Sequence, residues 1–242
     1  MPQLDLGDRS IYYEEHGSGY PVLLIAPGGM RSEVNWWQRA ALNPLAEYAG
    51  DFRLVAMDQR NAGRSTGPLD VEDPWGAYVD DQLALMDHLG HGSFHVLGCC
   101  IGCSYALLLA QRAPERVTSA VLQQPIGIVE GNREVFTGMW RDWAGELRAR
   151  RSDIDPATLE TFGTRMWDGE FVLSVSRDVV RSLPTPLLVL PGIDDFHPTE
   201  TGREVAALAP NAEIVEPWKD SPDHIRHAVD RAREFLREQT PG

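Results

Sequence analysis

The sequence predicts an α/β fold, in which a mostly parallel sheet is covered by helices on both faces and interrupted by one insertion. Three observations support this prediction. Short strand-like runs alternate with helix-like runs along most of the 242 residues, as in parallel sheets. One strand-like run turns within a few residues into a helix-like run, through a glycine-flanked segment at 98–102. Between 126 and 183 the alternation stops, which indicates an insertion, and the length suits a single domain of this kind.

The predicted elements follow in order along the chain. Apolar residues on both sides of Gly7-Asp8 predict a leading hairpin with strands at 4–6 and 11–14. Further strands are predicted at 22–26, 54–57, 94–97, 120–122, 187–190 and 214–215. Helices are predicted between and after them at 36–48, 75–89, 103–112, 199–209 and 224–238. The inserted segment is predicted to be helical, with no obvious strand before 171–175.

Composition excludes several classes of partner. The chain holds 36 acidic and 22 basic side chains, which gives a net charge of −14. Nucleic-acid binding needs a basic surface, so neither nucleic acid nor an anionic membrane is an expected partner. The polar, acidic start and the lack of any apolar run near the ~20 residues of a membrane span indicate a cytoplasmic protein. A small-molecule substrate is the expected partner, and a homodimer is left open.

The three cysteines of the chain lie together at positions 99, 100 and 103. Neighbours this close cannot staple distant elements, so they do not form a disulfide framework. A zinc site would need a complementary His/Cys pair at ligand spacing, and the sequence offers none. We therefore predict no bound metal.

The stretch Gly98-Cys99-Cys100-Ile101-Gly102 is the most informative part of the chain. A strand that turns sharply into a helix needs small residues around the turn, and its apex residue is held strained with the side chain exposed. The apex is Cys100, and the following helix N-terminus favours its reactive thiolate form. Cys100 is thus the predicted nucleophile, with Cys99 facing the opposite side and Cys103 behind it on the helix.

Five motifs in this order resemble the α/β-hydrolase family. The first four are a strand with a glycine loop at 21–29, an Asp-x-Arg-x-x-Gly-x-Ser turn at 58–65, the elbow at 98–102 and Pro-Glu-Arg-Val at 114–117. The fifth is a late strand that ends in Gly-Ile-Asp-Asp at 192–195. The elbow carries cysteine where the family usually has serine. The resemblance implies the α/β-hydrolase fold, with a core of 1–125 and 184–242 and a helical cap at 126–183. Most cap aromatics are expected to pack, while Trp140, Trp143 and Trp167 are expected to line an apolar substrate pocket.

The same resemblance implies an oxyanion hole and an orienting acid. The backbone N–H groups of Ile101 and of Gly29 or Met30 are the expected oxyanion donors, and Met30 is also expected to contact substrate. The family pattern Gly-x-x-Asp, with proline three residues beyond the acid, favours Asp195. Asp194 would then be a turn residue.

The histidine of the implied triad must follow the acid in the sequence. Three histidines do so, at 197, 224 and 227. His224, at the start of the final helix, is preferred; His197, beside the acid loop, is the competitor, and His227 is expected on the surface. The family's usual Gly-His is absent, and Trp218-Lys219 stands where that histidine often lies.

Together these residues predict a hydrolase with a Cys-His-Asp triad and no cofactor. It would cleave an ester, lactone or thioester of an apolar small molecule through a Cys100 acyl-enzyme. Two alternatives stay open, because fold does not fix function. One is an acyl cyclase, thioesterase-like enzyme or lyase on the same scaffold, and the other is a non-catalytic binder of a small ligand.

Overall fold

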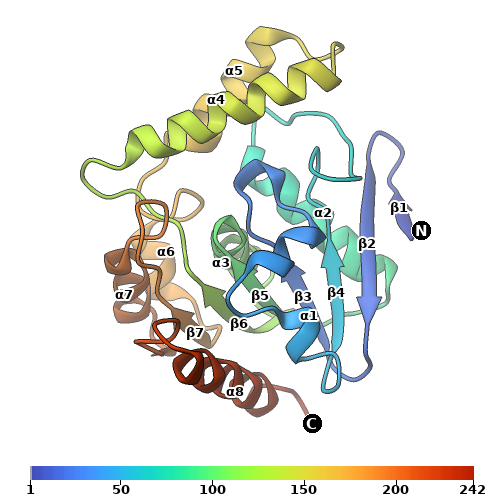
Figure 1. Ribbon diagram of the computed structural model, residues 1–242. Coiled ribbons are helices and arrows are strands. Elements are labelled where there is room, and N and C mark those ends of the chain that lie inside the picture. Colours follow the sequence, from blue (N-terminus) through green and yellow to red (C-terminus); the bar gives the residue numbers. More distant parts are fainter. Residues whose placement is uncertain (1) are drawn as a thin grey trace.

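The computed structural model describes residues 2–242 and contains an eight-stranded sheet (Figure 1). Along the sheet the strands follow the order β1-β2-β4-β3-β5-β6-β7-β8. The pairs β1–β2 and β2–β4 are antiparallel, and all later pairs are parallel. The strands are β1 (Gln3–Asp5), β2 (Ser10–His16), β3 (Pro21–Ile25), β4 (Arg53–Met57), β5 (Phe94–Cys99), β6 (Val117–Gln123), β7 (Leu187–Leu190) and β8 (Ala212–Ile214). This is the α/β-hydrolase fold, as the sequence predicts.

Helices cover both faces of the sheet because its central strands are apolar on both sides. On β3, Leu23 and Ile25 pack into one hydrophobic cluster, while Val22 and Leu24 pack into the other. The first cluster lies under α2 (Pro74–His88), α3 (Ile101–Arg112) and α7 (Thr199–Leu208). The second lies under the 3-10 helix η2 (Val34–Arg39), α1 (Pro44–Glu47) and α8 (Pro222–Glu238). The parallel strands therefore all end at one covered edge, where the site lies.

The segment between β6 and β7 contains α4 (Arg133–Arg150), α5 (Pro156–Trp167) and α6 (Arg177–Ser182). Helices α4 and α5 rise above the carboxyl edge of the sheet, while α6 lies next to α7 (Figure 1). Aromatic contacts join the raised pair, since Trp143 lies 5.4 Å from Trp140 and 6.3 Å from Phe162 between ring centroids. The Trp75 indole of α2 donates a 3.1 Å hydrogen bond to the Met166 carbonyl and so ties α5 to the core.

Two stretches differ from the elements that the sequence predicts. The single helix expected at 36–48 is split into η2 and α1, because Pro44 lacks the N–H that a continuous helix would use. Asn43 caps the new helix by accepting from the Leu45 N–H at 3.1 Å. The strand expected at 171–175 is wrong: Phe171 and Leu173 have φ of 54° and 69°, which an extended strand does not accommodate.

The turn after β4 is held in place by buried ion pairs. The Asp58 carboxylate accepts from the Val34 N–H at 2.8 Å and from the Arg64 guanidinium at 2.8 Å. Arg60 forms a bidentate pair with the buried Asp81 of α2, with both hydrogen bonds at 2.8 Å. These contacts fix the loop that borders the site.

No helix in the described part of the chain combines the length and apolar character needed to cross a bilayer.

Candidate active site

Cys100 occupies the sharp turn between β5 and α3 with φ 60° and ψ −121°. Such a backbone costs energy for a residue with a side chain, so the surrounding packing must hold it. The flanking glycines make this packing possible. A Cβ on Gly98 would clash with the Gly102 carbonyl, and a Cβ on Gly102 would clash with the Ile25 carbonyl of β3. Helix α3 therefore packs directly against β3, and its first turn faces the Cys100 side chain.

The three cysteines have different surroundings. Cys99 is buried in the cluster under α8, and burial raises the pKa of its thiol. Cys103 is buried in the first turn of α3, where its Sγ donates to the Gly98 carbonyl at 3.2 Å and burial again raises the pKa of its thiol. Cys100 is half-buried and is the one thiol of the three whose pKa is lowered. Cys99 and Cys103 thus lie on opposite faces of the sheet, and Cys103 is on the helix after the elbow, as the sequence predicts.

His197 is the group that lowers the Cys100 pKa. Burial acts against ionisation of the thiol, but the nearby charge of His197 outweighs it, with further help from the Gly28 and Ile101 N–H groups. The effect is mutual: burial would lower the pKa of His197, yet Cys100 and then Asp194 raise it. The imidazole Nδ1 lies 2.7 Å from Asp194 Oδ1. Its Nε2 is buried and bonds to no other nitrogen or oxygen within the described chain.

Asp194 and His197 are brought together by a tight turn after β7. The Asp194 carboxylate accepts from the backbone N–H groups of Phe196 and His197, each at 3.1 Å. Gly192 is required below this turn because a Cβ there would clash with the His197 Cβ. Burial opposes ionisation of Asp194, but its pKa is lowered by His197 and, to a smaller extent, by Lys219. The carboxylate is therefore charged while it holds the ring.

His224 and Asp195, the residues preferred from the sequence, do not join this group. Asp195 is exposed, and its carbonyl accepts from the Asn132 side chain at 2.9 Å. His224 lies in the first turn of α8, where its N–H donates to Ser221 Oγ at 3.1 Å and its Nδ1 has no partner within residues 2–242. The geometry instead places the competitor His197 next to Cys100 and in contact with Asp194. The Asp-x-x-His spacing was the available signal, since a turn brings residues three apart into contact.

Two backbone N–H groups act on the Cys100 thiol. The N–H groups of Gly28 and Ile101 help to lower its pKa, while the prediction that Ile101 and Gly29 or Met30 donate to an oxyanion stays a prediction. Gly29, the expected donor, is covered by the Met139 thioether of α4, which a Cβ on Gly29 would meet. Met30 is buried in the 3-10 helix η1 (Gly29–Arg31) beside this loop. The insertion thus reaches down to the glycine loop of the core.

Comparison with known proteins identifies the family. The description "alpha/beta hydrolase fold" fits residues 21–184, which is more than half of the chain. The chain belongs to the alpha/beta hydrolase family. Its fold is the one that the five sequence motifs imply.

Several relatives are hydrolases. A 2-hydroxymuconate semialdehyde hydrolase of Pseudomonas putida is 26% identical, with the match covering 83% of this chain and 79% of that protein. A putative carbamate hydrolase, RutD, of Azorhizobium caulinodans is 34% identical, but the match covers 50% of this chain and 43% of that protein. The structure of a meta-cleavage product hydrolase from Pseudomonas fluorescens IP01 superposes with a TM-score of 0.71 at 20% identity, covering 96% of each chain. The last comparison shows a shared fold alone.

Lys219 stands after β8, where the family often has its histidine. The preceding Trp218 is buried, and its indole donates to the Pro191 carbonyl at 2.6 Å. The Lys219 ammonium donates to the side chain of Gln124, a residue with φ 53° at the end of β6. Burial lowers the pKa of Lys219, while Asp194 opposes that change. The positive charge therefore helps to keep the Asp194 carboxylate ionised.

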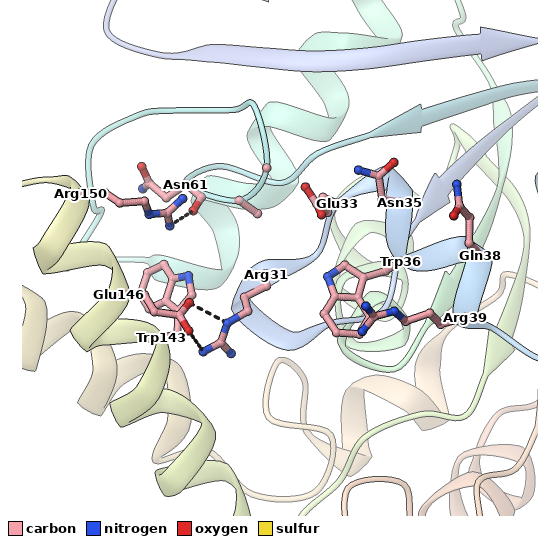
Figure 2. Close-up of a pocket in the computed structure, with 12 residues that line it drawn as sticks. Arg31, Glu33, Asn35, Trp36, Gln38, Arg39, Asn61, Trp143, Glu146 and Arg150 are labelled. Atoms are coloured by element: carbon pink, nitrogen blue, oxygen red, sulfur yellow. Dashed lines mark hydrogen bonds and ion pairs between the residues drawn. The ribbon is translucent and has the colours of Figure 1, made fainter.

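The three tryptophans of the insertion line two separate hollows. Trp143 lines a pocket of about 410 Å³ between α4, the η1–η2 segment and the loop after β4 (Figure 2). Trp140 and Trp167 line a groove of about 550 Å³ between α4 and α5. Their role in substrate binding stays a prediction. No group of three or more potential metal ligands gathers in the described part of the chain.

Proposed function

We propose that this chain is a cysteine-dependent hydrolase that cleaves an ester, lactone or thioester through a Cys100 acyl-enzyme. One observation carries the proposal: a strained Cys100 whose thiol pKa is lowered by His197, while Asp194 holds that imidazole by its other nitrogen at 2.7 Å. Opposite pKa shifts of a thiol and an imidazole favour a thiolate–imidazolium pair. Such a pair is a nucleophile with an acid already in place.

In the first half-reaction the Cys100 thiolate attacks the substrate carbonyl carbon. The carbonyl π electrons move to oxygen, and the N–H groups of Gly28 and Ile101 receive the negative charge. Each such donor contributes about 3 kcal/mol of barrier reduction in enzymes of this type. When the oxyanion collapses, the bond to the leaving group breaks, and the His197 imidazolium transfers its Nε2 proton to that group.

In the second half-reaction water hydrolyses the thioester. Neutral His197 takes a proton from water, and the resulting hydroxide attacks the acyl carbon. Collapse releases a carboxylic acid and restores the Cys100 thiolate beside imidazolium. Asp194 keeps the ring in the tautomer that presents Nε2 to the reacting atoms and stabilises its charged form.

The segment 126–183 serves in this proposal as the cap that selects the substrate. Support comes from Met139 of α4, which covers Gly29 of the oxyanion loop, and from the cluster of aromatic side chains in α4 and α5. Activated substrates such as thioesters and lactones suit a cysteine nucleophile. Since the Pseudomonas putida relative is named as a 2-hydroxymuconate semialdehyde hydrolase, C–C bond hydrolysis is the second candidate.

Acylation by a chromogenic thioester tests the proposal. Wild-type protein is expected to release a burst of one thiol per chain and to gain the acyl mass at Cys100. Cys100→Ala is expected to lose both, while Cys103→Ala, which changes a buried neighbour on α3, keeps both. Turnover by Cys100→Ala at the wild-type rate would exclude the mechanism. Product analysis on a meta-cleavage substrate in the same assay separates the two candidates.

A further inference from the structure

A pocket separate from the Cys100 sulfur lies between the cap and the core. Its walls come from three segments that are distant in sequence: η1–η2, the loop after β4, and the inner side of α4. Figure 2 shows Trp143, Glu146 and Arg150 of α4 facing Arg31 and Asn61 across the hollow, with Trp36 and Arg39 further along it. The pocket holds about 410 Å³, enough for a small organic molecule.

Two hydrogen-bond donors in this wall are buried without acceptors. Asn61 is 4% exposed, and its Nδ2 has no partner within residues 2–242. The amide orientation is fixed, because its Oδ1 accepts from the Gly67 N–H at 3.3 Å and from Arg151 at 3.2 Å, both of which are donors. Trp143 is fully buried, and its indole Nε1, which can act only as a donor, also lacks an acceptor in the described chain.

Several buried side-chain donors of the described chain lack an acceptor, and each one needs an explanation. Two of them in the wall of one pocket point to an acceptor that arrives from outside the chain. The backbone at Asn61 supports the same view, since its φ of 62° is strained for most residues with a side chain. Asparagine tolerates this conformation and places its amide at the wall.

The charge of the wall defines the chemistry of that acceptor. Three arginines face two glutamates, in a chain whose net charge is −14. Arg31 already neutralises Glu146, with hydrogen bonds of 2.8 and 2.9 Å. Arg39 stacks over Trp36 at 4.6 Å and forms no salt bridge within residues 2–242, and Arg150 bonds to the Asn61 carbonyl at 3.4 Å. Glu33 is the remaining negative group, and its carboxylate lies against Gly63.

We propose that this pocket binds a small organic carboxylate. Its oxygens accept from Asn61 Nδ2 and Trp143 Nε1, while Arg39 and Arg150 supply the countercharge. The pocket adjoins the site through Gly28, on which Trp36 packs so closely that a Cβ would clash. The carboxylate is therefore either the far end of a substrate or a separate ligand that acts on the glycine loop. The binding itself does not depend on the Cys100 chemistry.

Calorimetric titration with glutarate tests the pocket without any assay of activity. Glutarate is expected to bind with a Kd of about 1 mM or tighter, and uncharged glutaramide about tenfold more weakly. Asn61→Asp, which replaces the donor by an oxygen of the same shape, and Trp143→Phe, which removes the indole N–H together with the five-membered ring that carries it, should each weaken binding about tenfold. Arg148→Gln, on the same helix but lining the other groove, is the matched control and should bind as wild type.

Thermal unfolding of each variant shows whether it is folded. Arg150→Gln, at an exposed position, keeps the test decisive if a buried substitution unfolds the protein, because it too should weaken glutarate binding. Absence of glutarate binding to wild-type protein, or equal affinity in Asn61→Asp, Trp143→Phe and Arg150→Gln, would overturn the proposal.

Kinetics then separate the two sources of the carboxylate. If it belongs to the substrate, a glutaryl thioester should have a higher kcat/KM than a butyryl thioester in wild-type protein, and Asn61→Asp should erase that preference. If it is a separate ligand, free glutarate should change the rate with the butyryl thioester, and Asn61→Asp should abolish the change. A protein that binds glutarate but shows no acylation would retain the pocket and exclude the proposed hydrolase.

Discussion

Two loops at the carboxyl edge of the sheet show how this chain organises its site. The loop after β7 contains Asp194 and His197 in one tight turn, in which Asp194 bonds to His197 and His197 lowers the pKa of Cys100. The loop after β8 carries Trp218 and Lys219, which bond to the Pro191 carbonyl and to Gln124 instead. The first loop therefore holds both the acid and the base that we propose, while the second supplies packing and a positive charge.

The difference teaches that the position of a histidine along the chain does not determine its role. A base needs its Nε2 near the nucleophile and its Nδ1 on a carboxylate. His197 follows Asp194 by three residues in one turn, so its Nδ1 reaches the Asp194 carboxylate directly. His224 lies in the first turn of α8, where its backbone N–H is already used to cap the helix on Ser221. Chain order alone admits both histidines, but the contacts distinguish them.

The sharpest test of the comparison replaces each of the two histidines by alanine in a separate variant. His197→Ala is expected to slow acylation and deacylation by ~10² or more, the scale of general acid–base catalysis. His224→Ala removes a ring that has no contact with Cys100 and should change either step by less than about threefold, as surface substitutions do. Single-turnover kinetics with a chromogenic thioester measure both steps. A large loss of the acylation and deacylation rates in His224→Ala alone would identify His224 as the base instead.

The two adjacent acids offer a second test within the first loop. Asp194→Asn keeps the shape but removes the charge that holds His197, so kcat/KM should fall about 10-fold to 100-fold. Asp195→Asn, at an exposed side chain, is the matched control and should remain near wild type. Equal losses in the two variants would contradict the assignment of Asp194.

Much of the fold follows from sequence patterns that involve neighbouring residues. The elbow could be predicted because a Cβ at position 98 or 102 would clash with backbone, so the turn requires glycine at both positions and the pattern is visible in the sequence. The prediction of one helix at 36–48 was wrong because Pro44 interrupts it. The prediction of a strand at 171–175 was wrong because nothing in the sequence indicates the positive φ of Phe171 and Leu173. The contact between Asp194 and His197 was harder to predict, since Asp194 and Asp195 are the same residue type and only the turn decides which carboxylate faces the ring.

A pH titration of thiol reactivity tests the coupling between Cys100 and the first loop. Because the Cys100 pKa is lowered, the thiolate persists to lower pH than in a free cysteine, and iodoacetamide should react at correspondingly lower pH. His197→Ala removes the largest effect that lowers this pKa, so the midpoint should move upward. Alkylation rates followed by intact mass between about pH 5 and 9 give both midpoints. Cys103→Ala should leave the midpoint in place, and an unchanged midpoint in His197→Ala would refute the coupling.

The smallest expected effect concerns Lys219 in the second loop. Its ammonium lowers the pKa of Asp194, but less than His197 does. Lys219→Met removes the charge and keeps an unbranched side chain, so the Asp194 pKa should rise. A group with a lowered pKa loses its charge as pH falls, so the acidic limb of kcat/KM should move to higher pH, by about half a unit.

Activity near neutral pH should change little in Lys219→Met, because Asp194 remains ionised there. Lys219→Arg keeps the positive charge and is the matched control, with an acidic limb at the wild-type position. A loss of activity at all pH values in Lys219→Met, restored by Lys219→Arg, would show that the second loop takes part in the reaction itself. In that case the division between a catalytic loop after β7 and a supporting loop after β8 would not hold.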